Sequence, residues 1–86
     1  MEKHTILGVH ITNRMTRAKD VQKVFSEFGC NIRTRLGLHD VAKSACSPNG
    51  LILLEMVGKD AEINRLAKKL KAIKGVQIKK MVFTHS

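Results

Sequence analysis

The sequence contains no tryptophan or tyrosine and only three phenylalanines, which are Phe25, Phe28 and Phe83. Proteins that recognise single-stranded RNA on a sheet stack the bases on exposed aromatic rings. Phe25 and Phe28 belong to the apolar stripe of an amphipathic segment, so only Phe83 remains for such a role. The composition therefore disfavours nucleic-acid binding by base stacking.

Long apolar runs are also absent. The longest, Gly50 to Leu54, is far shorter than the roughly 20 residues that a membrane-spanning helix needs. Residues 1–12 have no long apolar core and no small-residue cleavage pattern, so they do not look like a signal peptide. We therefore expect a cytoplasmic protein without a membrane partner, in which Cys30 and Cys46 stay reduced.

The motifs of common catalytic sites are missing as well. The sequence has no Gly-x-Ser-x-Gly, no phosphate-cradling glycine loop and no His-Glu-x-x-His. Among its 7 acidic residues, no pair has a spacing that indicates acid–base catalysis. We expect a protein that is not an enzyme.

Positive charge, by contrast, is abundant. The chain has 16 Lys and Arg residues against 7 Asp and Glu, a formal charge of +9. Much of this charge lies in residues 68–80, KKLKAIKGVQIKK. A solvated helix face is the ordinary explanation, and an anionic ligand or nucleic acid is the alternative. Any nucleic-acid contact would be non-specific and driven by charge, because no DNA-reading element fits in the chain.

The hydrophobicity pattern predicts four strands and two helices in one domain that spans residues 1–86. The alternation or β-branched content typical of strands occurs in residues 4–12, 30–38, 51–57 and 76–83. Apolar residues recur at three- and four-residue steps in residues 17–28 and again after Asp60, which predicts amphipathic helices.

The expected helix ends follow from residue types that favour caps. Thr16 and Asp60 are expected N-caps. Gly29 is expected to end the first helix in the left-handed conformation, and Gly75 is expected to end the second.

The order β-α-β-β-α-β predicts a ferredoxin-like α+β fold, a four-stranded antiparallel sheet with two helices on one face. Strands one and three should then be central and strands two and four at the edges. Residues 51–54 are apolar on both sides, as a doubly covered central strand would be. We expect a second subunit to cover the sheet face that the helices leave bare, which makes the protein a homo-oligomer.

The bare face is also the first candidate for a ligand site. Arg33 and Arg35 lie two residues apart on a strand, so we expect them to point the same way and to clamp a carboxylate or phosphate. His10, Lys79 and Glu55 are expected nearby. The alternative is that the arginines decorate an edge strand or pair with a neighbouring subunit.

A metal site is a second candidate. His39 and Cys46 lie in the polar segment before Gly50, and His10 or another subunit could complete a transition-metal site. No two of the possible ligands have the tight spacing of a zinc finger, so a loop histidine and a small thiol are the alternative. A disulfide between Cys46 and Cys30 is not expected, because a strand over residues 30–38 would separate them by about 26 Å.

Several motifs together resemble a known family. They are Arg35-Leu-Gly-Leu-His39, Cys46-Ser-Pro-Asn-Gly50, Leu66-x-x-Lys-Leu70 and Ile73-x-Gly-Val-x-Ile-Lys-x-Met-Val82. With this pattern the chain resembles the small ACT-like domains, and most closely the regulators of iron-only hydrogenase systems. The resemblance covers nearly the whole chain.

The resemblance implies a non-enzymatic homo-oligomeric regulator, a dimer or tetramer that binds a small effector or metal between subunits. Such domains are similar to the regulatory domain of the nickel-responsive repressor. The repressor's DNA-reading segment and closely spaced histidines are absent here, and Thr12–Thr16 replaces the amino-acid-binding motif of ACT domains. The candidate ligand contacts are Arg33, Arg35, His39, Cys46, Asn13 and Arg14. The alternative function is a nucleic-acid-binding module that uses the basic second helix.

Overall fold

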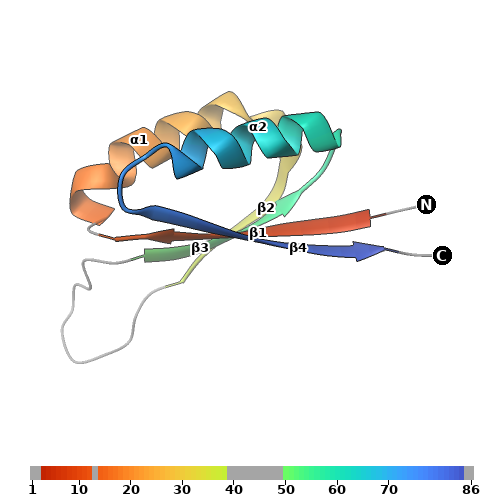
Figure 1. Ribbon diagram of the computed structural model, residues 1–86, viewed down its shortest axis with the longest axis horizontal. Coiled ribbons are helices and arrows are strands. Elements are labelled where there is room, and N and C mark those ends of the chain that lie inside the picture. Colours follow the sequence, from red (N-terminus) through yellow and green to blue (C-terminus); the bar gives the residue numbers. More distant parts are fainter. Residues whose placement is uncertain (1–2, 13, 39–49, 85–86) are drawn as a thin grey trace.

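The computed structural model describes residues 3–12, 14–38 and 50–84, and their order of elements is the predicted one (Figure 1). The elements are β1 (Lys3–Ile11), α1 (Arg14–Glu27), the 3-10 helix η1 (Gly29–Asn31), β2 (Ile32–Leu38), β3 (Gly50–Met56), α2 (Asp60–Lys71) and β4 (Val76–Thr84).

The four strands form one antiparallel sheet in the order β2-β3-β1-β4. Strands β3 and β1 are therefore central, and β2 and β4 are the edges, as predicted. Both helices lie on the same face of the sheet (Figure 1). The predicted ferredoxin-like α+β architecture is confirmed.

The core lies between the helices and the sheet because one side of each central strand is apolar. Leu7 and Val9 of β1 and Leu54 of β3 are fully buried, and they meet Val21 of α1 and Leu66 of α2. Burial of each such leucine stabilises the fold by about 1.5–3 kcal/mol. The other buried apolar residues are Ile11, Phe25, Phe28, Met56, Ile63, Leu70 and Val76.

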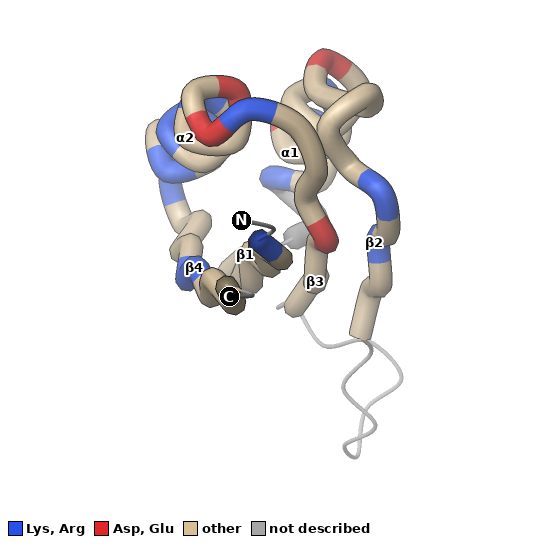
Figure 2. The backbone as a smooth tube through the Cα atoms, turned by 90° about the vertical axis from the view of Figure 1, so that its right-hand side faces the viewer, with Lys and Arg blue, Asp and Glu red and all other residues tan. Residues whose placement is uncertain are grey.

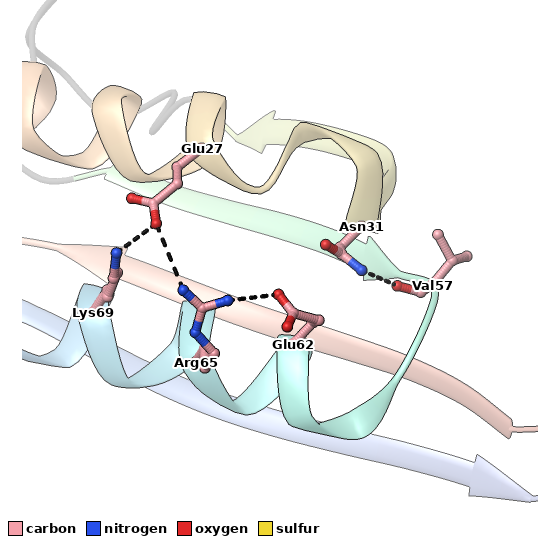
Figure 3. A network of polar contacts seen from close by, with 6 residues as sticks. All are labelled: Glu27, Asn31, Val57, Glu62, Arg65 and Lys69. Atoms are coloured by element: carbon pink, nitrogen blue, oxygen red, sulfur yellow. Dashed lines mark hydrogen bonds and ion pairs between the residues drawn. The ribbon is translucent and has the colours of Figure 1, made fainter.

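Charged side chains tie the two helices together at the surface. Glu27 of α1 accepts a hydrogen bond from Lys69 of α2 and lies 4.0 Å from Arg65 (Figure 3). Arg65 also donates to Glu62 at 2.8 Å. Of the predicted stripe residues, Phe28 lies beneath Arg65 and Lys69 of this network, and Phe25 is buried in the same core.

The start of each helix differs from the prediction. Helix α1 begins at Arg14, so Thr16 lies inside its first turn and is not the N-cap. Lys59 is the N-cap residue of α2, and Asp60 is the first helical residue. There the carboxylate of Asp60 still favours the helix through the dipole, because the first turn carries partial positive charge.

The two helix ends also differ from each other. Gly75, the predicted end of the second helix, follows α2 and has the left-handed conformation, with φ +87°. Gly29 does not have a positive φ, and that prediction is wrong. The chain leaves α1 through η1 instead, where the N–H of Asn31 donates to the carbonyl of Phe28 at 2.9 Å. With this turn, the chain leaves α1 without a residue in the left-handed conformation, and the Phe28 ring stays in the core.

Strand β2 contains an irregularity that the alternation of its residues does not reveal. Ile32 pairs with Met56, whereas Thr34 pairs with Glu55, so one extra residue lies between these two partners. Ile32 consequently faces the helices, while Thr34, Leu36 and Leu38 face the other side of the sheet. The alternation predicted for residues 30–38 is therefore interrupted between Ile32 and Thr34.

Candidate functional site

The sheet face opposite the helices, called the open face below, is largely apolar. Its side chains alternate along the strands with those of the core and include Ile6, Leu36, Leu38, Leu51, Leu53, Met81 and Phe83. The exposed fractions are 51% for Leu36 and Met81 and 54% for Phe83. An apolar patch of this extent on a small domain is typical of an interaction surface.

A polar cluster around the carboxylate of Glu55 lies at the β2 side of the open face. The Thr34 hydroxyl donates to Glu55 Oε1 at 2.8 Å. Arg33 Nη1 lies 3.9 Å from Glu55 Oε2, so it reaches the same carboxylate from the edge strand. Because Leu54 and Met56 are buried on the helix side, Glu55 must point to the open face.

The predicted arginine clamp is not formed. The Arg35 guanidinium lies over the Phe25 ring at 4.7 Å from its centroid, which places it on the helix side of the sheet. Arg33 lies with Glu55 on the other side. The extra residue near Arg33 in β2 reverses the alternation, and this explains why two residues two positions apart point to opposite faces.

The remaining predicted ligand contacts fall at the limits of the described chain. Asn13 and His39 lie outside the described residues, as does Cys46, and Arg14 is described only as the first residue of α1. The metal prediction therefore reduces to His10, which lies on the open face opposite Leu51. Its Nδ1 is buried and has no hydrogen-bond partner within the described ranges.

No metal centre forms elsewhere in residues 3–12, 14–38 and 50–84. No group of three or more His, Cys, Asp or Glu side chains comes together there. Cys30 is a free, exposed thiol in η1, just before β2.

A hollow lies on the helix side, between α1 and the ends of β2 and β3. Its volume is about 180 Å³. It is lined by Ile11, Ala18, Val21, Gln22, Gly37, Leu38, Gly50, Leu51 and Ile52. An apolar cavity of about 150 Å³ is enough to bind benzene, so this hollow has room for a small, mostly apolar group.

Gly37 keeps the hollow open. It pairs with Ile52 and faces α1, and a Cβ built on it would meet no atom within 4 Å. The sequence analysis did not identify this residue as part of a site. An isolated glycine inside a strand pattern is a signal for a close approach or a ligand, and Gly37 carries that signal.

The lysines of α2 and β4 form a basic surface on the side of the molecule away from β2 (Figure 2). A groove between these two elements contains Lys68, Lys71, Lys79 and Lys80. This is the segment in which the sequence concentrates its positive charge.

Comparison with known proteins shows similarity in fold. No protein-family model matches the sequence, and no curated protein is significantly similar to it. An uncharacterized protein from Thermotoga maritima superposes with a TM-score of 0.81 at 24% identity, over 96% of this chain and 100% of that one. The ACT domain of a GTP pyrophosphokinase from Chlorobium tepidum gives a TM-score of 0.60 at 23% identity, over 93% of this chain and 85% of that one.

A third match comes from part of a larger protein. A formyltetrahydrofolate deformylase from Pseudomonas putida KT2440 gives a TM-score of 0.57 at 17% identity, over 91% of this chain but 28% of that one. Together these structures show that the chain has a ferredoxin-like, ACT-like α+β fold, as the sequence predicts. Within the described residues, no helix is long and apolar enough to cross a membrane.

Proposed function

We propose that this protein is a non-catalytic, ligand-sensing regulatory domain whose self-association responds to a small effector. One observation carries the proposal. Leu38 and Leu51 are among the residues that line the hollow beneath α1, and strand alternation directs their side chains to the end of the open face, where the two residues are 41% and 37% exposed. A ligand in the hollow would therefore contact residues of the surface that a second copy would cover.

The coupling follows from mass action. A ligand that binds the associated form more tightly than the free form shifts the equilibrium towards association. A tenfold difference in affinity corresponds to about 1.4 kcal/mol. A change in the packing of two leucines is enough to supply a difference of this size, because burial of one leucine is worth about 1.5–3 kcal/mol.

The size of the open face supports a second copy as its partner. Four strands spaced by about 4.8 Å and seven to nine residues long at about 3.3 Å per residue cover roughly 500 Å². Two such faces would bury roughly 1,000 Å², which is near the lower limit for a specific interface. The likeness in fold to the ACT domain of the Chlorobium tepidum GTP pyrophosphokinase supports the assignment to a ligand-sensing regulatory domain.

Two finer proposals rest on the sequence pattern. The resemblance to regulators of iron-only hydrogenase systems points to control of such a system as the cellular role. A transition metal held between subunits through His10, His39 and Cys46 is a further candidate effector. The Nδ1 atom of His10 supports it, because it is buried without a hydrogen-bond partner in the described residues, and an unsatisfied buried nitrogen points to a missing ion or water.

The test combines native mass spectrometry with light scattering on anaerobically purified protein. We expect a dimer or tetramer whose dissociation constant changes when amino acids, short carboxylic acids, Ni²⁺, Zn²⁺ or Fe²⁺ are added one at a time. A strict monomer that responds to none of them would contradict the proposal.

A cavity-filling variant then locates the site. Gly37→Val places a branched side chain in the hollow, where there is space for it, so the response to an organic effector should be lost while the fold is kept. Gly29→Val is the matched control, since a Cβ there also meets nothing within 4 Å and Gly29 lies away from the hollow. Equal responses of the two variants would show that the effector binds elsewhere.

A further inference from the structure

The groove between α2 and β4 contains positive charge that is not neutralised. Two other lysines have carboxylate partners, because Lys3 pairs with Asp60 and Lys69 pairs with Glu27. Lys19, Lys23, Lys59 and Lys74 have no carboxylate within ion-pair distance in the described residues, but they do not share one groove. In the described part of the chain, no carboxylate lies within ion-pair distance of Lys68, Lys71, Lys79 or Lys80. The groove therefore has a strong positive potential.

The neighbours of these lysines offset little of this charge. Asp60 is close enough to Lys80 for their charges to interact, but Asp60 forms its ion pair with Lys3. Lys80 donates to the amide oxygen of Asn64 at 3.3 Å, which is a neutral acceptor. The floor between the cations is aliphatic and consists of Ala67 and Ile78. The side chain of Lys79 lies on the open-face side of β4, because Lys79 pairs with Gly8. An anion in the groove would meet the ammonium groups of Lys68, Lys71 and Lys80 and no competing carboxylate among the residues that line it.

The shape of the groove favours an extended anion over a compact one. The lining residues of α2 run from Asn64 to Lys71. At a rise of about 1.5 Å per residue this span is about 10 Å. A DNA strand carries one phosphate per about 3.4 Å of helix axis, so about three phosphates of one strand would fit along it.

The edge strand can add hydrogen bonds to the same anion. Strand β4 pairs only with β1 in the sheet, so the backbone N–H groups of its outer edge have no strand partner. Backbone N–H groups of this kind are common donors to phosphate oxygens. The groove also has no aromatic lining residue, so single-stranded bases would find no ring on which to stack.

We propose that the α2–β4 groove binds the phosphate backbone of double-stranded nucleic acid without reading its sequence. This binding function goes beyond the effector sensing proposed above and uses a different surface. It gives a domain without a DNA-reading element a means of staying close to nucleic acid.

The experiment measures the affinity for short random-sequence DNA and RNA duplexes by fluorescence anisotropy across a salt series. Each lysine that neutralises a phosphate contributes about −0.9 to the slope of log K against log salt. We expect a slope of about −3 for the unmodified protein, and weaker binding to single strands than to duplexes.

A matched pair of double variants tests the location. Lys68→Gln with Lys71→Gln should reduce the magnitude of the slope by about 2, because two phosphate contacts are lost. Lys19→Gln with Lys23→Gln removes the same charge from exposed positions of α1 and should leave the slope nearly unchanged. Lysine and glutamine have similar helix propensities, so both variants should fold.

Three results would overturn the proposal. Equal loss of binding in the two double variants would show that net charge alone attracts the nucleic acid. A flat salt response would show that phosphates are not contacted. Competition by inorganic phosphate or ATP far below the salt concentration that releases the duplex would show a site for compact phosphates.

Discussion

Leu38 and Leu51 are register partners at the end of the β2–β3 pair, and together they belong to both the hollow and the open face. Leu36 and Gly37, which precede Leu38 on the same strand, each face only one of these two surfaces. Leu36 points to the open face, and Gly37 points into the hollow. Neighbouring positions of one strand can therefore be used to test association and effector binding separately.

Association should depend on Leu36. We expect Leu36→Glu to raise the dissociation constant of the homo-oligomer by at least about 100-fold, because burial of one leucine on each of two copies is worth about 1.5–3 kcal/mol apiece. Sedimentation velocity over a concentration series measures this. Val82→Glu is the control, since Val82 is exposed at 45% but lies on the other face of β4. Association that survives Leu36→Glu would show that the open face is not the interface.

The two arginines of β2 should contribute unequally to stability. Replacement of Arg35 by Met removes the guanidinium over Phe25 and should lower the free energy of unfolding by about 0.5–1 kcal/mol. Arg33→Met removes an exposed contact at 3.9 Å from Glu55 and should change it by less than about 0.5 kcal/mol. Urea denaturation of both variants compares them, and a larger loss for Arg33→Met would contradict the assignment of the two faces.

The helix–helix contact at Glu27 should depend on pH. The hydrogen bond from Lys69, followed by the charges of Lys69, Arg65 and Lys23, lowers the pKa of Glu27 from its ordinary value of 4.5. A lowered pKa in the folded state means that the contact contributes stability above the unfolded pKa, and that this contribution is lost as the pH falls through the folded pKa.

A comparison of Glu27→Gln with the unmodified protein measures this contribution. The difference in unfolding free energy should be constant near neutral pH and should shrink as the pH falls below 4.5. Asp60 is a second site with a pKa lowered by Lys3, so Asp60→Asn should behave in the same way. A difference that grows towards acid pH would contradict the sign.

Gly58 should be intolerant of a side chain. It has φ +98°, and a Cβ built on it would lie 2.5 Å from Asn31 Nδ2, which donates to the Val57 carbonyl at 3.0 Å (Figure 3). We expect Gly58→Ala to lower the free energy of unfolding by about 1–3 kcal/mol. Gly29→Ala should be close to neutral, because its Cβ meets nothing within 4 Å.

The double variant Asn31→Ala with Gly58→Ala separates the two causes in Gly58→Ala. Removal of the Asn31 amide relieves the clash but not the backbone strain. The double variant should therefore lose less unfolding free energy than the sum of the losses in the two single variants. Strict additivity, measured by urea denaturation, would show that Asn31 moves away without cost.

The sequence by itself determined the fold, because each element carries its own periodic signal. The alternation in residues 4–12 predicted β1, whose Leu7, Val9 and Ile11 face the core, and the apolar stripe of the first helix includes Phe25, which packs in the same core. Gly75 was identified as a helix end because left-handed conformation is a local property of glycine. Strand order followed from the apolar character of β3 on both sides.

The candidate sites depended on tertiary structure. Alternation predicted one face for Arg33 and Arg35, but pairing of β2 with β3 inserts an extra residue and moves them to opposite faces. The hollow is likewise made by residues of α1, β1, β2 and β3 that are distant in sequence. Local patterns record which side of an element is apolar. Strand register and the packing of a helix over a sheet are set by interactions between elements. These interactions bring Gly37, Leu38 and Leu51 together at the hollow.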